Sequence, residues 1–197
     1  MGGGIIGFII ITMNHPSECT KFSPELFEQL YTRSKQLLSW TRKKAEIIEA
    51  YILRNKENQN LPYVSAGEIY YAHLGANIGS EMDKERPVLI FQTDDRFVRQ
   101  SNMAVIIPIT SNITIRPYRV LISPSDIEDN HDIAKSSVLV QQIRSISKAR
   151  LSQLKGKLSK AKLDEVSLEV NRLLYKSTPL LLEGDAQATV SGTAKNK

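Results

Sequence analysis

GEIYYAHLGANIGSEMDKERPVLIFQTDDRFVRQSNMAVIIPITSN, residues 67–112, is the stretch that decides the fold. It contains three apolar, β-prone runs that are separated by polar turns, a pattern typical of short consecutive strands. Arg86 precedes the second run, and Thr110 and Ser111 close the third. Because polar side chains at strand ends are held in place by the sheet behind them, this pattern predicts a functional site on the rim of a rigid sheet.

More strands follow in the second half of the chain. Two further apolar segments, Tyr118–Ile122 and Ser137–Arg144, are each expected to form one strand. This succession of short strands predicts a compact, mostly antiparallel barrel or sandwich. Ser159 is then positioned to cap a last helix, and residues 177–197 have the small, polar composition of a disordered tail.

The N-terminal part follows a helical pattern instead. Ser23-Pro24-Glu25 has the residue types of a helix start, and apolar residues recur at spacings of three and four up to about Lys56. One or two amphipathic helices are expected. Two interpretations are open. The helices bind another molecule, which is a partner protein, a second copy of the chain or a nucleic acid, or they pack on their own domain. With a polar linker near Pro62, the chain divides into an extension (1–62), a strand-rich domain (63–176) and a tail (177–197).

Composition narrows the function classes without choosing one. The formal net charge of +5 permits a polyanionic partner but does not require one. The only cysteine is Cys19 and the three histidines are scattered, so neither a disulfide framework nor a zinc site is expected, and no cofactor is predicted. The apolar run in residues 1–12 is too short to span a bilayer. These features predict a cytoplasmic protein with no membrane partner.

Ordered short motifs from Gly67 to about Tyr175 resemble the MazF/PemK family of toxin endoribonucleases. Each motif is weak alone, but their order and spacing all fit. They are Gly67-Glu68-Ile69, Leu74-Gly75, Gly79-Ser80-Glu81, Arg86-Pro87-Val88-Leu89, Pro108-Ile109-Thr110-Ser111-Asn112, Ser137-Val138, Gln142-Ile143-Arg144-Ser145-Ile146, Lys148-Ala149-Arg150-Leu151 and Glu165-Val166.

The resemblance implies an α+β fold: a small, half-open antiparallel β-barrel of the MazF/CcdB type with a C-terminal helix, here preceded by a helical extension. It also implies a homodimer that cleaves single-stranded RNA without a metal and is held inactive by a cognate antitoxin. Arg86 and Thr110 match the catalytic arginine and threonine of the family. The positions that line its RNA groove are matched by Glu81, Ser111 and Gln142.

The side chains themselves suit metal-free RNA cleavage, in which the 2′-hydroxyl of the substrate is the nucleophile. A guanidinium such as that of Arg86 can hold two phosphate oxygens and is always charged, so it stabilises the phosphorane. For the same reason it is a poor free base. Thr110 would donate a hydrogen bond to a phosphate oxygen or orient the attacking hydroxyl. The general base is not assigned: Arg86, Glu81 and His73 are all candidates.

Other interpretations of the same residues remain open. Arg86 could simply form a salt bridge with Asp83 or Glu85, and Tyr70, Tyr71 and Phe97 could pack in the core instead of stacking on bases. Lys148, Arg150, Lys155 and Lys157 could contact RNA phosphates or only solvent. The whole chain could be a gyrase-directed poison, another non-catalytic interaction module, or a self-inhibited regulator whose N-terminal helices cover the groove.

Overall fold

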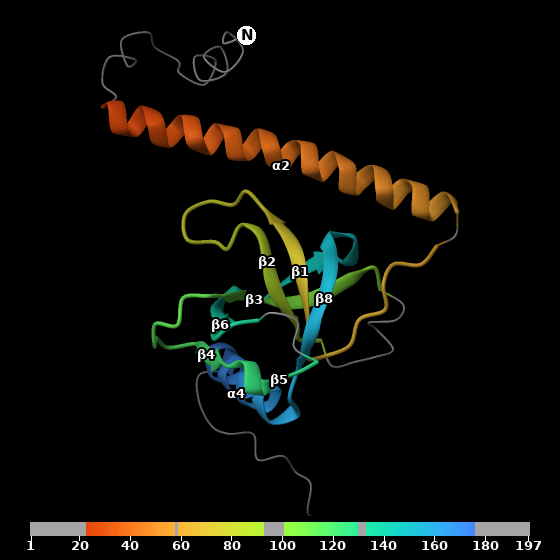
Figure 1. Ribbon diagram of the computed structural model, residues 1–197, viewed down its shortest axis with the longest axis vertical. Coiled ribbons are helices and arrows are strands. Elements are labelled where there is room, and N and C mark those ends of the chain that lie inside the picture. Colours follow the sequence, from red (N-terminus) through yellow and green to blue (C-terminus); the bar gives the residue numbers. More distant parts are fainter. Residues whose placement is uncertain (1–22, 58, 93–100, 130–132, 176–197) are drawn as a thin grey trace, which may run out of the picture.

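The computed structural model describes residues 23–57, 59–92, 101–129 and 133–175. Helix α2 (Pro24–Lys56) lies across one end of a strand-rich body, and helix α4 (Lys160–Tyr175) lies at the opposite end (Figure 1). Helix α4 begins directly after Ser159, as the sequence predicts. The expected apolar start (1–12) and tail (177–197) lie outside the described residues.

Eight strands form the body, and every pairing between them is antiparallel. The order across the sheet is β4-β6-β3-β2-β1-β8-β5, with β7 pairing with β3 beside β6. Among the described residues no pairing joins the outer strands β4 and β5, so the barrel is half-open. This confirms the expected fold class. The bounds are β1 Glu68–Gly75, β2 Lys84–Ile90, β3 Met103–Thr110, β4 Arg119–Ile122, β5 Ile127–Glu128, β6 Ser136–Leu139, β7 Arg144–Ser147 and β8 Leu151–Leu158.

The two faces of the central strands contribute to two apolar clusters. Leu89 belongs to the cluster that α4 covers with Val166 and Val170. Val88 and Ile90 belong to the other cluster, with residues of β1, β3 and β7. Because side chains alternate along a strand, Arg86 shares the face of Val88 and Ile90. The strand that carries the candidate arginine is therefore anchored on both faces.

Helix α2 is a single, long helix that touches the body along one side only. Ser23 caps it as predicted, since its hydroxyl accepts a hydrogen bond from the Leu26 amide at 3.3 Å. No residue of α2 is buried, and several large apolar side chains, among them Leu38 at 58% exposure, face away from the body. Neither described helix combines the length and the apolar character that crossing a bilayer requires.

One prediction about the later strands is wrong, and one strand was missed. Ser137–Arg144 is not one strand, because a 3-10 turn, η3 (Val140–Gln142), separates β6 from β7. Strand β8 was not anticipated at all. Its sequence, LSQLKGKL, contains a glycine and several polar residues. Half of its residues are exposed to solvent. Strand propensity alone does not find such a segment.

Candidate active site

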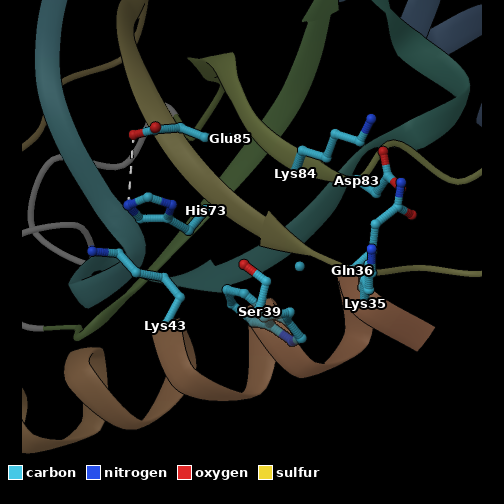
Figure 2. A pocket seen from close by; sticks show the side chains of 11 residues that line it. Lys35, Gln36, Ser39, Lys43, His73, Asp83, Lys84 and Glu85 are labelled. Carbon is cyan, nitrogen blue, oxygen red and sulfur yellow. Dashed lines mark ion pairs between the residues drawn. The ribbon is translucent and has the colours of Figure 1, made fainter. Parts of the chain in front are cut away.

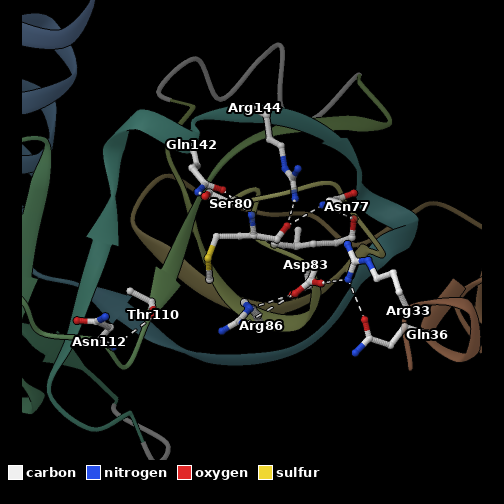
Figure 3. A network of polar contacts seen from close by, with 12 residues as sticks. Arg33, Gln36, Asn77, Ser80, Asp83, Arg86, Thr110, Asn112, Gln142 and Arg144 are labelled. Atoms are coloured by element: carbon white, nitrogen blue, oxygen red, sulfur yellow. Dashed lines mark hydrogen bonds and ion pairs between the residues drawn. The ribbon is translucent and has the colours of Figure 1, made fainter. Parts of the chain in front are cut away.

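Arg86 lies near the start of β2, after the loop that joins β1 to β2. Its Nε donates a hydrogen bond to the Asp83 backbone oxygen at 2.9 Å, and its Nη2 lies 3.9 Å from Asp83 Oδ1. The second contact is an ion pair too long for a hydrogen bond. Nε is therefore fixed, while in the described part of the chain the two terminal nitrogens keep their N–H groups for another acceptor (Figure 3). The salt bridge that the sequence left open forms with Asp83.

The register of β2 and β3 relates Arg86 to Thr110. Val88 pairs with Pro108 and Ile90 pairs with Ile106. Continuing this register by two residues places Arg86 opposite Thr110. Because side chains alternate along strands, the two side chains point to the same face. A cation and a hydroxyl thus share one end of this strand pair.

Thr110 is half-buried, and its neighbours hold its hydroxyl in a defined orientation. Its Oγ1 accepts a hydrogen bond from the Asn112 amide at 3.3 Å, and the Asn112 carbonyl accepts one from the fully buried Ser137 hydroxyl at 2.8 Å. Since Thr110 Oγ1 is an acceptor in this turn, its own hydrogen is available for donation. Ser111 is exposed immediately after the strand.

The loop between β1 and β2 is held in place by hydrogen bonds to residues from the second half of the chain. Gln142 accepts a hydrogen bond from the Met82 amide at 2.7 Å and donates one to the Ser80 carbonyl at 2.9 Å. The Met82 carbonyl accepts a further bond from Arg144 at 3.0 Å (Figure 3). Glu81, between the two fastened residues, is exposed. Both ends of the Gln142 amide are therefore engaged with the loop.

His73 lies on the other face of the β1–β2 hairpin. It pairs across the strands with Glu85, and its Nε2 is 3.5 Å from the Glu85 carboxylate (Figure 2). Both residues line a cavity of about 400 Å³ between the hairpin and α2. Because neighbouring positions on a strand point to opposite faces, His73 does not share a face with Arg86.

Two side chains that the sequence offered as possible RNA contacts, Lys148 and Tyr70, are buried in the domain. Lys148, at 2% exposure, is not a surface ligand for phosphates, and burial lowers the pKa of its ammonium group. Tyr70 is also buried, and burial raises the pKa of its hydroxyl to about 12. Its hydroxyl donates to Glu68 at 3.2 Å, so it packs in the core and does not stack on bases. Phe97 lies outside the described residues.

The sequence profile of a family described as PemK-like, MazF-like toxins of type II toxin-antitoxin systems matches residues 65–174, more than half of the chain. The chain belongs to this family. The match covers every strand and nearly all of α4, and it leaves α2 outside. As a PemK/MazF-like toxin, the chain therefore carries a helix that the family pattern does not account for.

Two curated relatives of this PemK/MazF-like toxin are similar over the same part. Endoribonuclease EndoA from Bacillus subtilis is 35% identical over 107 residues, which are 52% of this chain and 87% of the relative. Endoribonuclease MazF9 from Mycobacterium tuberculosis is 30% identical over 105 residues, which are 51% of this chain and 86% of the relative. A crystal structure of MazF from Deinococcus radiodurans, 19% identical, superposes with a TM-score of 0.50 over 57% of this chain and 97% of that one, which shows the shared fold.

Several residues of this toxin's site escaped the sequence interpretation. The sequence indicated Asp83 only as a possible salt-bridge partner of Arg86, and it did not indicate Arg33 or Asn77 as site residues. Arg33 meets Asp83 across 50 positions of sequence, a contact that no spacing rule reveals. Asn77 acts within the β1–β2 loop, where its Nδ2 donates to the Met82 carbonyl at 2.7 Å. Within the described ranges no cluster of three or more His, Cys, Asp or Glu side chains could hold a metal ion.

Proposed function

We propose that this chain is a toxin endoribonuclease that cleaves single-stranded RNA at specific sequences and without a metal. The observation that carries the proposal is the placement of Arg86. In a chain of this toxin family, an arginine is fixed by its Nε at the rim of the sheet and keeps its terminal nitrogens for a phosphate. Two relatives named as endoribonucleases support the RNA-cleaving activity.

The proposed reaction is a transesterification. The 2′-oxygen attacks the adjacent phosphorus, a new P–O2′ bond forms, and the P–O5′ bond breaks. The products are a 2′,3′-cyclic phosphate and a 5′-hydroxyl end. The 2′-proton passes to a base, for which Glu81 is our candidate, and the leaving 5′-oxygen takes up a proton. Arg86 neutralises the charge of the phosphorane.

Thr110 contributes orientation in this scheme. Its hydroxyl accepts from the Asn112 amide, so its hydrogen is directed outward to a phosphate oxygen or to the attacking hydroxyl. Ser111 and Glu81, both exposed at the same rim, are proposed to contact the RNA. Gln142 is proposed to act at the groove by holding the loop on which Glu81 lies.

The proposal extends to assembly and control. The family is defined by toxin-antitoxin systems, so we propose a cognate antitoxin that blocks the RNA groove. A homodimer, in which a second copy completes the groove, and a cytoplasmic location belong to the same proposal. No cofactor is proposed.

The decisive experiment is direct. Purified protein is incubated with a mixed-sequence single-stranded RNA in EDTA, and the new 5′ ends are mapped. We expect cleavage at a short recurring sequence that leaves 5′-hydroxyl ends. Intact RNA would refute the nuclease and favour a gyrase-directed poison or another non-catalytic module on this fold. Cleavage that requires a divalent metal would refute the mechanism.

A substitution tests the loop-holding role of Gln142. Gln142→Leu keeps the volume but removes both hydrogen bonds, leaving the Met82 amide unpaired, which costs about 1–3 kcal/mol. We expect the cleavage rate to fall by roughly tenfold to a hundredfold because the loop shifts. Gln141→Leu, at the exposed neighbouring position, is the matched control. Equal rates for the two variants would contradict the role.

A further inference from the structure

Helix α2 is docked on the body beside the candidate active site. Trp40 packs on Gly75 so closely that a Cβ there would lie 3.1 Å from the indole ring. The Arg150 guanidinium lies over the same ring, 5.4 Å from its centroid. Near the end of the helix, the Tyr51 hydroxyl accepts a hydrogen bond from Asn102 at 3.3 Å. These contacts hold the middle and the end of α2 on the body, and the helix passes over the β1–β2 loop (Figure 1).

The contact nearest the site joins two arginines to one carboxylate. Arg33 Nη1 of α2 donates to Asp83 Oδ2 at 3.0 Å, while Asp83 Oδ1 lies 3.9 Å from Arg86 Nη2 (Figure 3). Arg33 is itself oriented by Gln36, whose Oε1 accepts a hydrogen bond at 2.8 Å. The Asp83 side chain is only 17% exposed, so solvent screens these interactions less than those of a surface pair.

Arg33 and Arg86 compete for this carboxylate. A carboxylate beside an arginine normally closes into a short, charge-assisted hydrogen bond. Here the short bond goes to Arg33, and Arg86 is left with an ion pair that is too long for one. If Arg33 were absent, the Asp83 side chain could rotate onto Arg86 and occupy the terminal nitrogens that a phosphate needs.

We propose that Arg33 is a positioning residue of the RNA site: by holding the Asp83 carboxylate, it keeps the Arg86 guanidinium open to the scissile phosphate. This inference rests on the proposed nuclease function. It gives the helix outside the family match a role in activity, the opposite of a helix that inhibits the enzyme by covering the groove.

The test uses the full chain and a short single-stranded RNA that contains the mapped cleavage sequence. Arg33→Ala is expected to lower kcat on the order of tenfold with little change in KM, because Arg86 acts on the phosphorane more than on the bound substrate. Arg33→Lys should recover most of the rate, since an ammonium can still pair with Asp83. Arg42→Ala, an exposed position on the same helix with the same change of charge, is the matched control.

A second-site variant separates the mechanism from general damage to the fold. In Arg33→Ala/Asp83→Asn the competing charge is absent, so the double variant should cleave faster than Arg33→Ala alone. A purely structural role for Arg33 predicts no such recovery. Cleavage is measured well below the melting temperature of every variant.

A spectroscopic arm does not depend on catalysis. The Arg86 Nε–Hε group donates to the Asp83 backbone oxygen and belongs to the guanidinium that a released Asp83 carboxylate would approach. Its NMR resonance, assigned through its loss in Arg86→Lys, should therefore shift in Arg33→Ala and stay in place in Arg42→Ala. If the wild type leaves RNA intact, the proposed function fails, and this resonance still decides whether Arg33 controls the Asp83–Arg86 contact. An unmoved resonance, an unchanged kcat, faster cleavage by Arg33→Ala or an equal loss in Arg42→Ala would each overturn the inference.

Discussion

Arg86→Ala is expected to reduce the rate of RNA cleavage by at least about 100-fold to 1,000-fold, the loss typical when one preorganised donor to a developing oxyanion is removed. The reason is geometric as well as electrostatic. Nε is tied to the Asp83 carbonyl at 2.9 Å, so the guanidinium is already oriented before RNA binds. Removing it deprives the phosphorane of a positive charge that is already in position, so that no entropy is lost in orienting it during the reaction. The measurement is single-turnover cleavage of a defined RNA in EDTA.

Two variants make the Arg86 result specific. Arg86→Lys keeps a positive charge but loses the planar fork, so an intermediate rate is expected. Arg172→Ala removes an arginine of α4 that is 72% exposed and that, within the described residues, forms an ion pair with its helix neighbour Glu169, so the rate should equal that of the wild type. Because Arg86 also braces the loop, melting curves are compared. Cleavage by Arg86→Ala at the rate of Arg172→Ala would remove Arg86 from the mechanism.

The strand-rich part of the fold could be predicted because its signals are local. The apolar runs around Val88 and Ile107 are short, buried and bounded by polar turns, and the structure places both residues in the core at 0% exposure. Strand β8 gave no such signal. It is recruited by pairing with β1, and only tertiary context makes a strand of a segment that contains Lys155, Gly156 and Lys157.

The site divides in the same way. Arg86 and Thr110 could be singled out because each stands at the end of an apolar run inside a motif of fixed order. What surrounds them could not, because the contacts are long-range: Gln142 reaches the loop at Ser80, and Arg33 reaches Asp83 across 50 positions of sequence. The sequence left the base open among Arg86, Glu81 and His73, and it could not show that His73 lines a cavity together with residues of α2.

The Arg33–Asp83 contact also alters how the extension is understood. The exposed apolar residues of α2, such as Leu38 and Ile52, show that packing on its own domain accounts for only one side of the helix. The docked side carries Arg33, Trp40 and Tyr51, which all reach residues of the strand-rich domain. A change in α2 therefore has a direct physical route to Arg86, through a single carboxylate.

Gly156→Ala is expected to cause a large loss of stability at a position outside the site. Gly156 has φ +146°, and a Cβ there would lie 2.7 Å from the Ile127 side chain and 2.9 Å from the Glu128 carbonyl oxygen. Backbone strain of about 1–3 kcal/mol and overpacking of a similar size add to about 2–6 kcal/mol. For a chain of this length we expect the melting temperature to fall by roughly 10 °C.

Gly79→Ala is the matched control for this prediction. Gly79 also has a positive φ, +62°, but a Cβ there would meet no atom within 4 Å. Its cost is the left-handed backbone alone, about 1–2 kcal/mol. Thermal unfolding of both variants thus separates steric clash from backbone strain. Equal melting temperatures would mean that β5 and β8 can move apart at little cost. The close packing at Gly156 would then not be needed for the pairing of these two strands.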